Sequence, residues 1–302
     1  MEALANRGHP GGVGTRSRWG ASARRLVGNG LLYLTLGALA VGFIVPYLWM
    51  FSSSLKPARE IFQYIMPLSW KTFIPQVFTL DAYRELFHLV PFPISRYLAN
   101  SVFVALSVTI LSLVVNALAA YAFAKLEFPG RGVLFGLFLS TMIVPFEVLA
   151  IPLYMQVRSF GWINTYQVLI IPWVAQPLGI FLLRQFFQEI PKELEEAARI
   201  DGCSYFGAFR RIVLPNSIPA LVAFALIRFQ ASWDAFIWPL IAAPAAEKRV
   251  IQIAIASFAT EVQTRWDLTF AASTMATIPI IVLFLLLQRY YVQGVIMSGL
   301  KG

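Results

Sequence analysis

The chain has 302 residues, of which 58% are hydrophobic and only 13% are charged, and its formal net charge is +9. Soluble proteins average roughly 25% charged residues, so a soluble fold of this length could not bury so much apolar surface. The basic residues are scattered between apolar runs instead of being gathered on one segment, which argues against a nucleic-acid partner. The composition therefore indicates an integral membrane protein in contact with a lipid bilayer.

Six apolar segments are long enough to cross the hydrocarbon core, which takes about 20 residues in a helix. They cover residues 30–51, 101–124, 133–156, 168–187, 218–243 and 268–287. The preceding Gly- and Arg-rich tail, residues 1–28, is expected to be cytoplasmic and disordered. The polar stretch between the first two segments is the longest loop. We predict one transmembrane domain over residues 29–302.

The distribution of Lys and Arg predicts the orientation, because cytoplasmic loops keep an excess of these residues. Placing both termini in the cytoplasm puts more of them inside than outside. The predicted fold is an all-α membrane protein with six transmembrane helices and a cytoplasmic loop at about residues 188–216, between the fourth and fifth helices.

Within that loop, local signals predict a helix of about three turns. Pro191 suits the first turn of a helix, and Glu193, Glu195 and Glu196 favour its positive end. Gly202 suits the end of the helix. The sequence thus predicts a short helix that lies across the membrane face.

A second short helix is predicted directly after the first. Ser204 is a good N-cap residue, and Pro215 should stop the helix that follows it. In the first helix, one side is small and apolar by its spacing, and it carries Leu194, Ala197, Ala198 and, less squarely, Ile200. Another backbone could approach closely on that side.

The residue pattern of this loop resembles the EAA loop of ATP-binding-cassette importer permeases. The pattern is Glu196, Ala197, Ala198, Asp201 and Gly202, followed by Phe209, Ile212, Leu214 and Pro215. The segments GWINTYQVLIIP, WDAFIWPLI and RYYVQGVIMSGLKG resemble the carbohydrate-uptake branch, specifically its maltose-type and glycerol-phosphate-type permeases. The resemblance covers nearly the whole chain from about Gly30.

The resemblance implies a role for each residue of the pattern. In that family the loop docks as a coupling helix into a groove on the ATP-binding subunit. Glu196 would be a polar contact to the ATPase, with Asp201 nearby, and Gly202 would set the angle between the two short helices. Ala197 and Ala198 would pack into the groove.

The resemblance also implies partners, substrate and location. They are a second homologous permease subunit, two copies of an ATP-binding subunit and an extracytoplasmic substrate-binding protein, in a bacterial or archaeal cell membrane. The cargo would be a sugar or sugar derivative. The chain itself has no Gly-x-x-x-x-Gly-Lys-Ser/Thr stretch, so ATP and Mg are expected on the partner ATPase, and this chain is expected to be a non-catalytic subunit without a cofactor.

Three charged residues fall inside predicted spans, where each costs about 2.5 to 3.5 kcal/mol on insertion scales. Glu147 and Asp234 fall at a similar depth in the outer half, and Arg228 lies roughly 9 Å deeper at 1.5 Å per residue. Ideal helical spacing places Arg228 and Asp234 on different faces. We therefore expect an ion pair between Arg228 and Glu147.

Two interpretations of these residues remain open. In the first, the ion pair only fastens the third and fifth spans together. In the second, Asp234 lines the translocation path with Gln230 and Trp233 nearby, and these residues offer acceptors and an aromatic face to sugar hydroxyls.

A secondary transporter and a membrane enzyme are two other classes of function for a chain of this kind. A self-contained secondary transporter of a small polar solute usually shows inverted repeats and paired broken helices, and neither is clear here. A membrane enzyme acting on lipid-linked sugars would need an acidic or His-rich surface loop, for which Asp201 and Gly202 are a weak candidate. His9 and His88 lie far apart in the sequence, and Cys203 is the only cysteine. We expect no catalytic residue and no metal site.

Overall fold

The computed structural model describes residues 18–67, 69–259 and 264–299, and the side chains of residues 28–67, 69–259 and 264–289. Its contacts divide the chain into two units, residues 1–49 and 50–302. In the described ranges the regular secondary structure is helical, apart from an isolated β-bridge between Ala259 and Thr264. The predicted all-α class is confirmed for these ranges.

The first unit is helix α1 (Arg18–Ser53), whose last residues belong to the second unit. It is apolar from Gly28 onward and long enough to cross a membrane. The described part of the tail, residues 18–28, is helical and continues this helix toward the N-terminus, since its Ala, Arg and Leu residues favour helix. The rest of the predicted tail, residues 1–17, lies outside the described residues.

Two further helices of the second unit are continuous and long enough to span a membrane. They are α3 (Ile94–Lys125) and α14 (Trp266–Gly299), of which Trp266–Arg289 meets the length and hydropathy needed. Together with α1, they confirm the first, second and sixth predicted segments as uninterrupted apolar helices.

The third predicted segment is bent. Helix α4 (Arg131–Ser140) continues through a 3₁₀ turn to Ile143, and α5 (Phe146–Ser159) then runs at 102° to it. Pro145 causes the break, because the residue before a proline is pushed into extended backbone, as Val144 is with φ −78° and ψ 115°. The segment predicted over residues 133–156 therefore consists of two helices.

The fourth predicted segment is also interrupted. Helix α6 (Tyr166–Ile170) and the 3₁₀ turn Ile171–Trp173 lead into α7 (Pro177–Glu189) with a bend of 44°. Gln176, which precedes Pro177, is extended with φ −129° and ψ 117°.

The fifth predicted segment ends early. Helix α11 (Ile218–Trp233) stops before Asp234, and α12 (Ile237–Ala242) follows after a short non-helical link. The remaining elements are short, and they are α2 (Asp81–Phe87), α8 (Lys192–Ile200), α9 (Tyr205–Ala208), a π-helical turn (Phe209–Val213), α10 (Leu214–Asn216), α13 (Ile251–Ala256) and 3₁₀ turns at Trp70–Thr72 and Ala246–Lys248.

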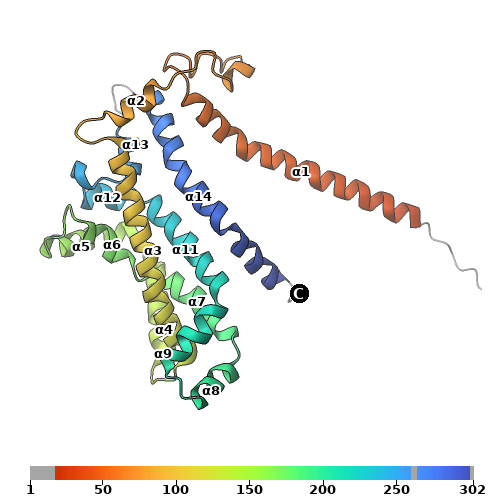
Figure 1. Ribbon diagram of the computed structural model, residues 1–302, viewed down its shortest axis with the longest axis vertical. Coiled ribbons are helices and arrows are strands. Elements are labelled where there is room, and N and C mark those ends of the chain that lie inside the picture. Colours follow the sequence, from red (N-terminus) through yellow and green to blue (C-terminus); the bar gives the residue numbers. More distant parts are fainter. Residues whose placement is uncertain (1–17, 68, 260–263, 300–302) are drawn as a thin grey trace, which may run out of the picture. The chain divides into compact units, whose positions relative to one another are not determined.

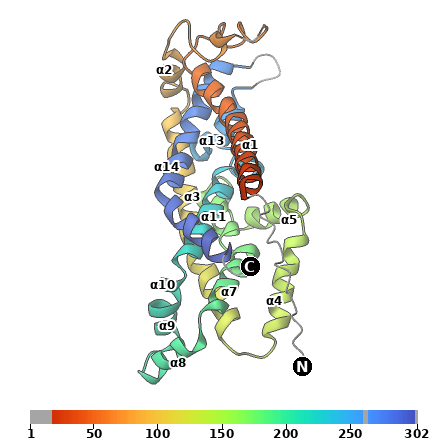
Figure 2. The same cartoon turned by 90° about the vertical axis from the view of Figure 1, so that its right-hand side faces the viewer.

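Helix α3 forms the centre of the second unit. It packs along α7 and α11, and α11 packs in turn against α14 (Figure 1). Helices α8, α9 and α10 lie together at one end of this unit, and α2 lies at the opposite end (Figure 2). The two ends are thus connected by the same long helix, α3.

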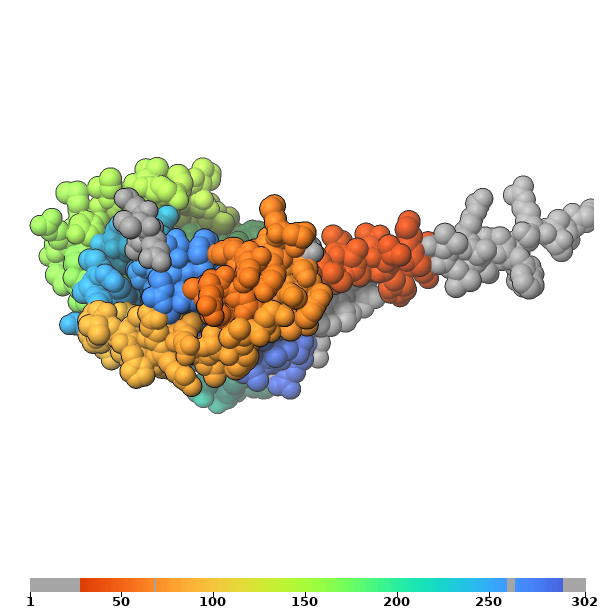
Figure 3. Space-filling model, turned by 90° about the horizontal axis from the view of Figure 1, so that it is seen from above, coloured from red at the N-terminus to blue at the C-terminus, as the bar shows by residue number. Residues whose placement is uncertain are grey.

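The polar loop between α1 and α2 is folded, and it lies beside the start of α14 at the α2 end of the unit (Figure 3). Two buried charged side chains hold it together. Lys56 Nζ donates to the Thr72 carbonyl at 2.7 Å, and the Glu60 carboxylate accepts from the backbone N–H groups of Gln76 and Val77 at 2.6 and 3.0 Å. Burial lowers the pKa of the Lys56 ammonium, whereas the nearby Glu60 carboxylate raises it.

Candidate functional site

Helix α8 begins and ends where the sequence predicts. Pro191 precedes it, acidic residues occupy its first turn, and its last residue is Ile200. Gly202 adopts φ +87°, the left-handed conformation that glycine tolerates best. The Gly202 N–H donates to the Arg199 carbonyl at 3.0 Å, and the Cys203 N–H donates to the Ala198 carbonyl at 2.9 Å. This pair of bonds is a Schellman motif, which explains why the chain turns at Gly202.

The second short helix follows at once. Ser204 Oγ accepts from the Gly207 N–H at 3.1 Å and caps its start. The helix runs through the π-helical turn to Asn216, one residue after Pro215, and the chain then turns by 80° into α11. The predicted pair of short helices is confirmed.

The outer face of α8 is exposed and partly apolar. Ile200 is 86% exposed and Leu194 is 49% exposed. The residues predicted to contact an ATPase lie on this helix and the turn after it, with Ala198 half-buried and Glu196, Ala197, Asp201 and Gly202 exposed. Large apolar side chains exposed at such a tip are typical of a surface that another protein covers.

Sequence reasoning missed the role of Glu195, which it grouped with the other acidic residues of the first turn. Glu195 is only 9% exposed. Its Oε1 lies 2.8 Å from Lys125 Nζ at the end of α3, an ion pair without the angular geometry of a hydrogen bond, and its Oε2 accepts from the Tyr121 hydroxyl at 3.0 Å. The spacing of Glu195 and Ala198 marks an inward side of α8, but the sequence does not show which basic residue faces it.

The predicted ion pair between Arg228 and Glu147 is wrong. Glu147 is exposed in the first turn of α5, and the described ion pairs do not include it. The 102° bend before α5 is the reason, because depth counted along a straight third span does not apply beyond it.

Arg228 instead stabilises the break in the fourth segment. This side chain is 8% exposed, and its guanidinium donates to the Trp173 carbonyl at 2.9 Å and to Ser112 Oγ at 3.4 Å. Trp173 is the last residue before the break, where helical bonding of the backbone is interrupted. In a membrane, such carbonyls need partners from neighbouring helices.

Asn116 of α3 completes this arrangement. Its Nδ2 donates to the Val174 carbonyl at 2.8 Å, and its Oδ1 accepts from the Gln176 N–H at 2.8 Å. Asn116 was not among the predicted site residues, and its polar side chain within an apolar span was the signal that could have identified it.

Asp234 lies at the end of α11, where that helix breaks. Its N–H donates to the Gln230 carbonyl at 3.0 Å, and Gln230 Nε2 donates back to the Asp234 carboxylate. Both side chains are exposed. Trp233, by contrast, is 1% exposed and stacks on Phe229 with ring centroids 5.6 Å apart. It packs inside the helical core, so the expectation that Trp233 offers an aromatic face beside Asp234 was wrong.

The three helix breaks meet around one pocket of about 420 Å³, which we call the break pocket. Its polar lining residues are Gln176, Arg228, Ser232 and Asp234, and its aromatic ones are Phe146, Trp173, Phe236 and Trp238. The break pocket therefore brings Arg228 and Asp234 to one cavity, although ideal helical spacing had placed them on different faces. Within residues 18–67, 69–259 and 264–299, no three His, Cys, Asp or Glu side chains are close enough to hold a metal ion.

Known proteins resemble this chain over most of its length. Residues 112–297 match the family described as "binding-protein-dependent transport system inner membrane component". An arabinooligosaccharides transport system permease protein, AraQ of Halalkalibacterium halodurans, is 34% identical over 271 residues, which cover 89% of this chain and 96% of AraQ. The trehalose transport system permease protein SugB of Mycobacterium tuberculosis is 35% identical over 275 residues, covering 89% of this chain and 97% of SugB.

A solved structure shows the same fold. It belongs to a bacterial ABC transporter involved in the import of the acidic polysaccharide alginate, and it aligns with a TM-score of 0.77 and 22% identity over 91% of this chain and 98% of that one. The fold, the family match and the relatives all indicate the same kind of protein. The chain belongs to the family of binding-protein-dependent transport system inner membrane components, the permease subunits of ABC importers.

Proposed function

We propose that this permease forms half of the path for a sugar or sugar derivative and is driven by a separate ATPase. The ATPase binds the coupling loop, residues 188–216, through Glu196, Ala197, Ala198, Asp201 and Gly202. The observation that carries the proposal is the exposed outer face of α8, which ends at the left-handed Gly202 and presents Leu194 and Ile200 to solvent. ATP and Mg belong to the partner in this proposal, and this chain carries no cofactor.

The proposed topology has six spans and both termini in the cytoplasm. Three helices are long and apolar enough to cross a membrane, and the count rises to six if each bent pair of helices is one span. The last of these pairs joins the second short helix to α11, and in the proposed topology only α11 of that pair enters the membrane. The excess of Lys and Arg in the tail and in the coupling loop supports placing these segments inside. The break pocket then lies within the membrane and the coupling loop lies at its inner surface.

The proposed assembly contains a second homologous permease subunit, two ATPase copies and an extracytoplasmic substrate-binding protein. Support comes from the family description, which names a binding protein. A further solved structure is that of a bacterial alginate ABC transporter in complex with an alginate pentasaccharide-bound periplasmic protein, and it aligns with a TM-score of 0.58 and 16% identity over 89% of this chain and 96% of that one.

The proposed cargo rests on the relatives and on the break pocket. The relatives are named for arabinooligosaccharides and trehalose, which are sugars. Aromatic rings beside a few polar groups suit a sugar, which presents apolar ring faces and many hydroxyls. Asp234 would accept hydrogen bonds from those hydroxyls, and Gln230 would both donate and accept them. Arg228 would line the wall while it holds the backbone of the fourth span.

Affinity purification from membranes, with the partner subunits co-expressed, tests the ATPase assignment. The wild-type chain should retain an ATPase. Gly202→Asp should reach the membrane at the wild-type level and retain little ATPase, because an L residue is strained at φ +87° and the angle between the short helices would change. Glu193→Gln, an exposed change on α8, is the matched control.

Reconstitution of the chain alone supplies the opposite test. Transport by the isolated chain in liposomes, driven by an ion gradient without ATP, would show a secondary transporter and remove the proposed function.

A further inference from the structure

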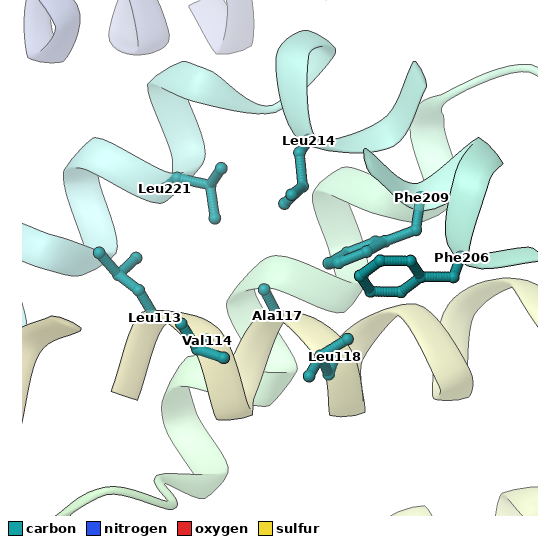
Figure 4. A pocket seen from close by; sticks show the side chains of 8 residues that line it. All are labelled: Leu113, Val114, Ala117, Leu118, Phe206, Phe209, Leu214 and Leu221. Atoms are coloured by element: carbon teal, nitrogen blue, oxygen red, sulfur yellow. The ribbon is translucent and has the colours of Figure 1, made fainter. Parts of the chain in front are cut away.

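One face of α3 runs past the second short helix and then reaches α8. Ala117, Tyr121 and Lys125 are spaced by four residues and share this face. Ala117 lines an apolar pocket of about 370 Å³ between α3 and the segment from α9 to α11, which Phe206 and Phe209 face from the other side (Figure 4). Packing between the helices is therefore incomplete at this level.

The next two turns of the same face make direct polar contacts. The Tyr121 hydroxyl lies 3.0 Å from Glu195 Oε2 and 3.2 Å from the Tyr205 carbonyl. Lys125 Nζ lies 2.8 Å from Glu195 Oε1 and donates to the Ile190 carbonyl at 2.7 Å. Both charged side chains are buried. Tyr121 and Lys125 of α3 thus bind the Glu195 carboxylate of α8, and the same two side chains also bind the start of the second short helix and the residue after α7.

The same α3 helix also holds the break in the fourth segment through Ser112 and Asn116. Asn116 and Lys125 are nine residues apart, or about 14 Å along a helix at 1.5 Å per residue. The uninterrupted helix α3 therefore contacts the coupling loop at one point and the wall of the break pocket at another.

We infer that the buried ion pair of Glu195 with Lys125, supported by Tyr121, fastens α8 to α3 so that a displacement of α8 moves α3 and, through Asn116, the break pocket. This inference rests on the proposed coupling function. In this inference Glu195 is a positioning residue. It faces α3, whereas an ATPase would contact the outer face of α8. The ion pair suits this role because separating a buried pair leaves an uncompensated charge, whereas the neighbouring turn at Gly202 is open to solvent.

The experiment follows the distance between α8 and α3 through the ATP cycle. Spin labels are placed at Glu193→Cys on α8 and Leu111→Cys on α3, both exposed, in a Cys203→Ser background of the complex with its ATPase. Pulsed electron resonance then compares the nucleotide-free state with the state trapped by Mg-ATP and vanadate. Hydrolysis of Mg-ATP is measured on the same samples.

The wild-type chain should give one unchanged distance in both states, because α8 and α3 move together. Glu195→Gln should keep the ATPase and its hydrolysis, yet shift that distance by roughly 1–2 Å or more on trapping, the size of ordinary shifts between packed helices. Glu127→Gln, which removes an exposed carboxylate after α3 and outside the coupling loop, is the control and should behave as wild type.

A second variant distinguishes loss of the ion pair from misfolding. Glu195→Gln with Lys125→Met removes both charges, so no unpaired charge is left buried, and it should accumulate normally while showing the same shift. An unchanged distance in this variant or in Glu195→Gln overturns the inference, as does a distance that already changes in the wild-type chain. A wild-type chain that retains no ATPase overturns the proposed function instead, and the two failures are thereby distinguished.

Discussion

The coupling loop and the break pocket differ in how their residues are brought together. The coupling loop is a continuous run whose helices begin and end at local signals, such as Ser204 at an N-cap and Gly202 in a Schellman motif. The break pocket collects side chains from α3, α5, α6, α11 and α12, together with the turn at Trp173 and the residues that precede α7 and α12. A docking surface can thus be read from neighbouring residues, whereas a cavity depends on where separate helices bend.

Buried charge is also used differently in the two regions. In the coupling loop Glu195 finds a charged partner, Lys125, and the outer face of α8 stays free for another protein. At the break pocket Arg228 binds a backbone carbonyl, and the carboxylate of Asp234 stays exposed. Substitutions should therefore affect partner binding in the first region, and stability or transport in the second.

The largest effect is expected for Ala197→Trp in the coupling loop. Ala197 is exposed, so the indole breaks no internal contact, but it would prevent close approach of an ATPase groove. Retained ATPase should fall more than about tenfold, which corresponds to about 1.4 kcal/mol of binding free energy, and uptake should be abolished. Co-purification measures the retained ATPase, an uptake assay measures transport, and thermal unfolding checks that the variant is folded.

Ala256→Trp, at an exposed alanine of α13, is the matched control for Ala197→Trp and should retain the ATPase. Wild-type retention and uptake in the Ala197→Trp variant would contradict a docking role for the outer face of α8.

The next effect is expected for Arg228→Met, which concerns stability. The change removes the charged donor of the Trp173 carbonyl, which keeps only the longer bonds from Ser112 Oγ at 3.3 Å and Gln176 Nε2 at 3.4 Å. A hydrogen bond that involves a charged group contributes about 1.5–3 kcal/mol. Thermal unfolding in detergent should occur at a lower temperature, and Arg228→Lys should restore part of the loss. Arg84→Met is the control, because it removes only an exposed ion pair with Asp81. An unchanged unfolding temperature for Arg228→Met would show that this hydrogen bond does not hold the fourth segment.

A smaller and purely functional effect is expected for Asp234→Asn. The amide keeps the shape of the side chain and an oxygen that can accept from Gln230, so assembly and unfolding should not change. Loss of a charged acceptor for a sugar hydroxyl should raise the KM for uptake by about tenfold. Uptake kinetics provide the measurement, with the exposed Asp81→Asn as control. Loss of assembly in place of a raised KM would favour a fastening role for Asp234.

The smallest effect is expected for Glu147→Gln. Glu147 is exposed, and the described ion pairs do not include it. Uptake should stay within about twofold of wild type, as for most surface substitutions. A loss of subunit assembly in this variant would restore the idea that Glu147 fastens two spans together.

The helices that could be predicted are those whose signals are local. The uninterrupted apolar runs of α1, α3 and α14 each form one helix, and the coupling loop folds as its caps and prolines require. The breaks within the third, fourth and fifth segments could not be predicted from the sequence. A proline such as Pro145 favours a break in the helix but does not specify the angle of the break. No strong helix-breaking residue marks the end of α11 at Trp233.

By itself, the sequence determined the membrane class, the three continuous apolar helices and the pair of short helices with the EAA pattern, because apolar length and helix capping depend on residues close together in the chain. Only the tertiary structure decided that Glu195 reaches Lys125, that Arg228 binds the Trp173 carbonyl instead of Glu147, and that Trp233 is buried. These contacts depend on bends and on packing between distant segments. A buried polar group takes whichever partner the folded backbone brings within reach, and periodicity along one helix does not specify that partner.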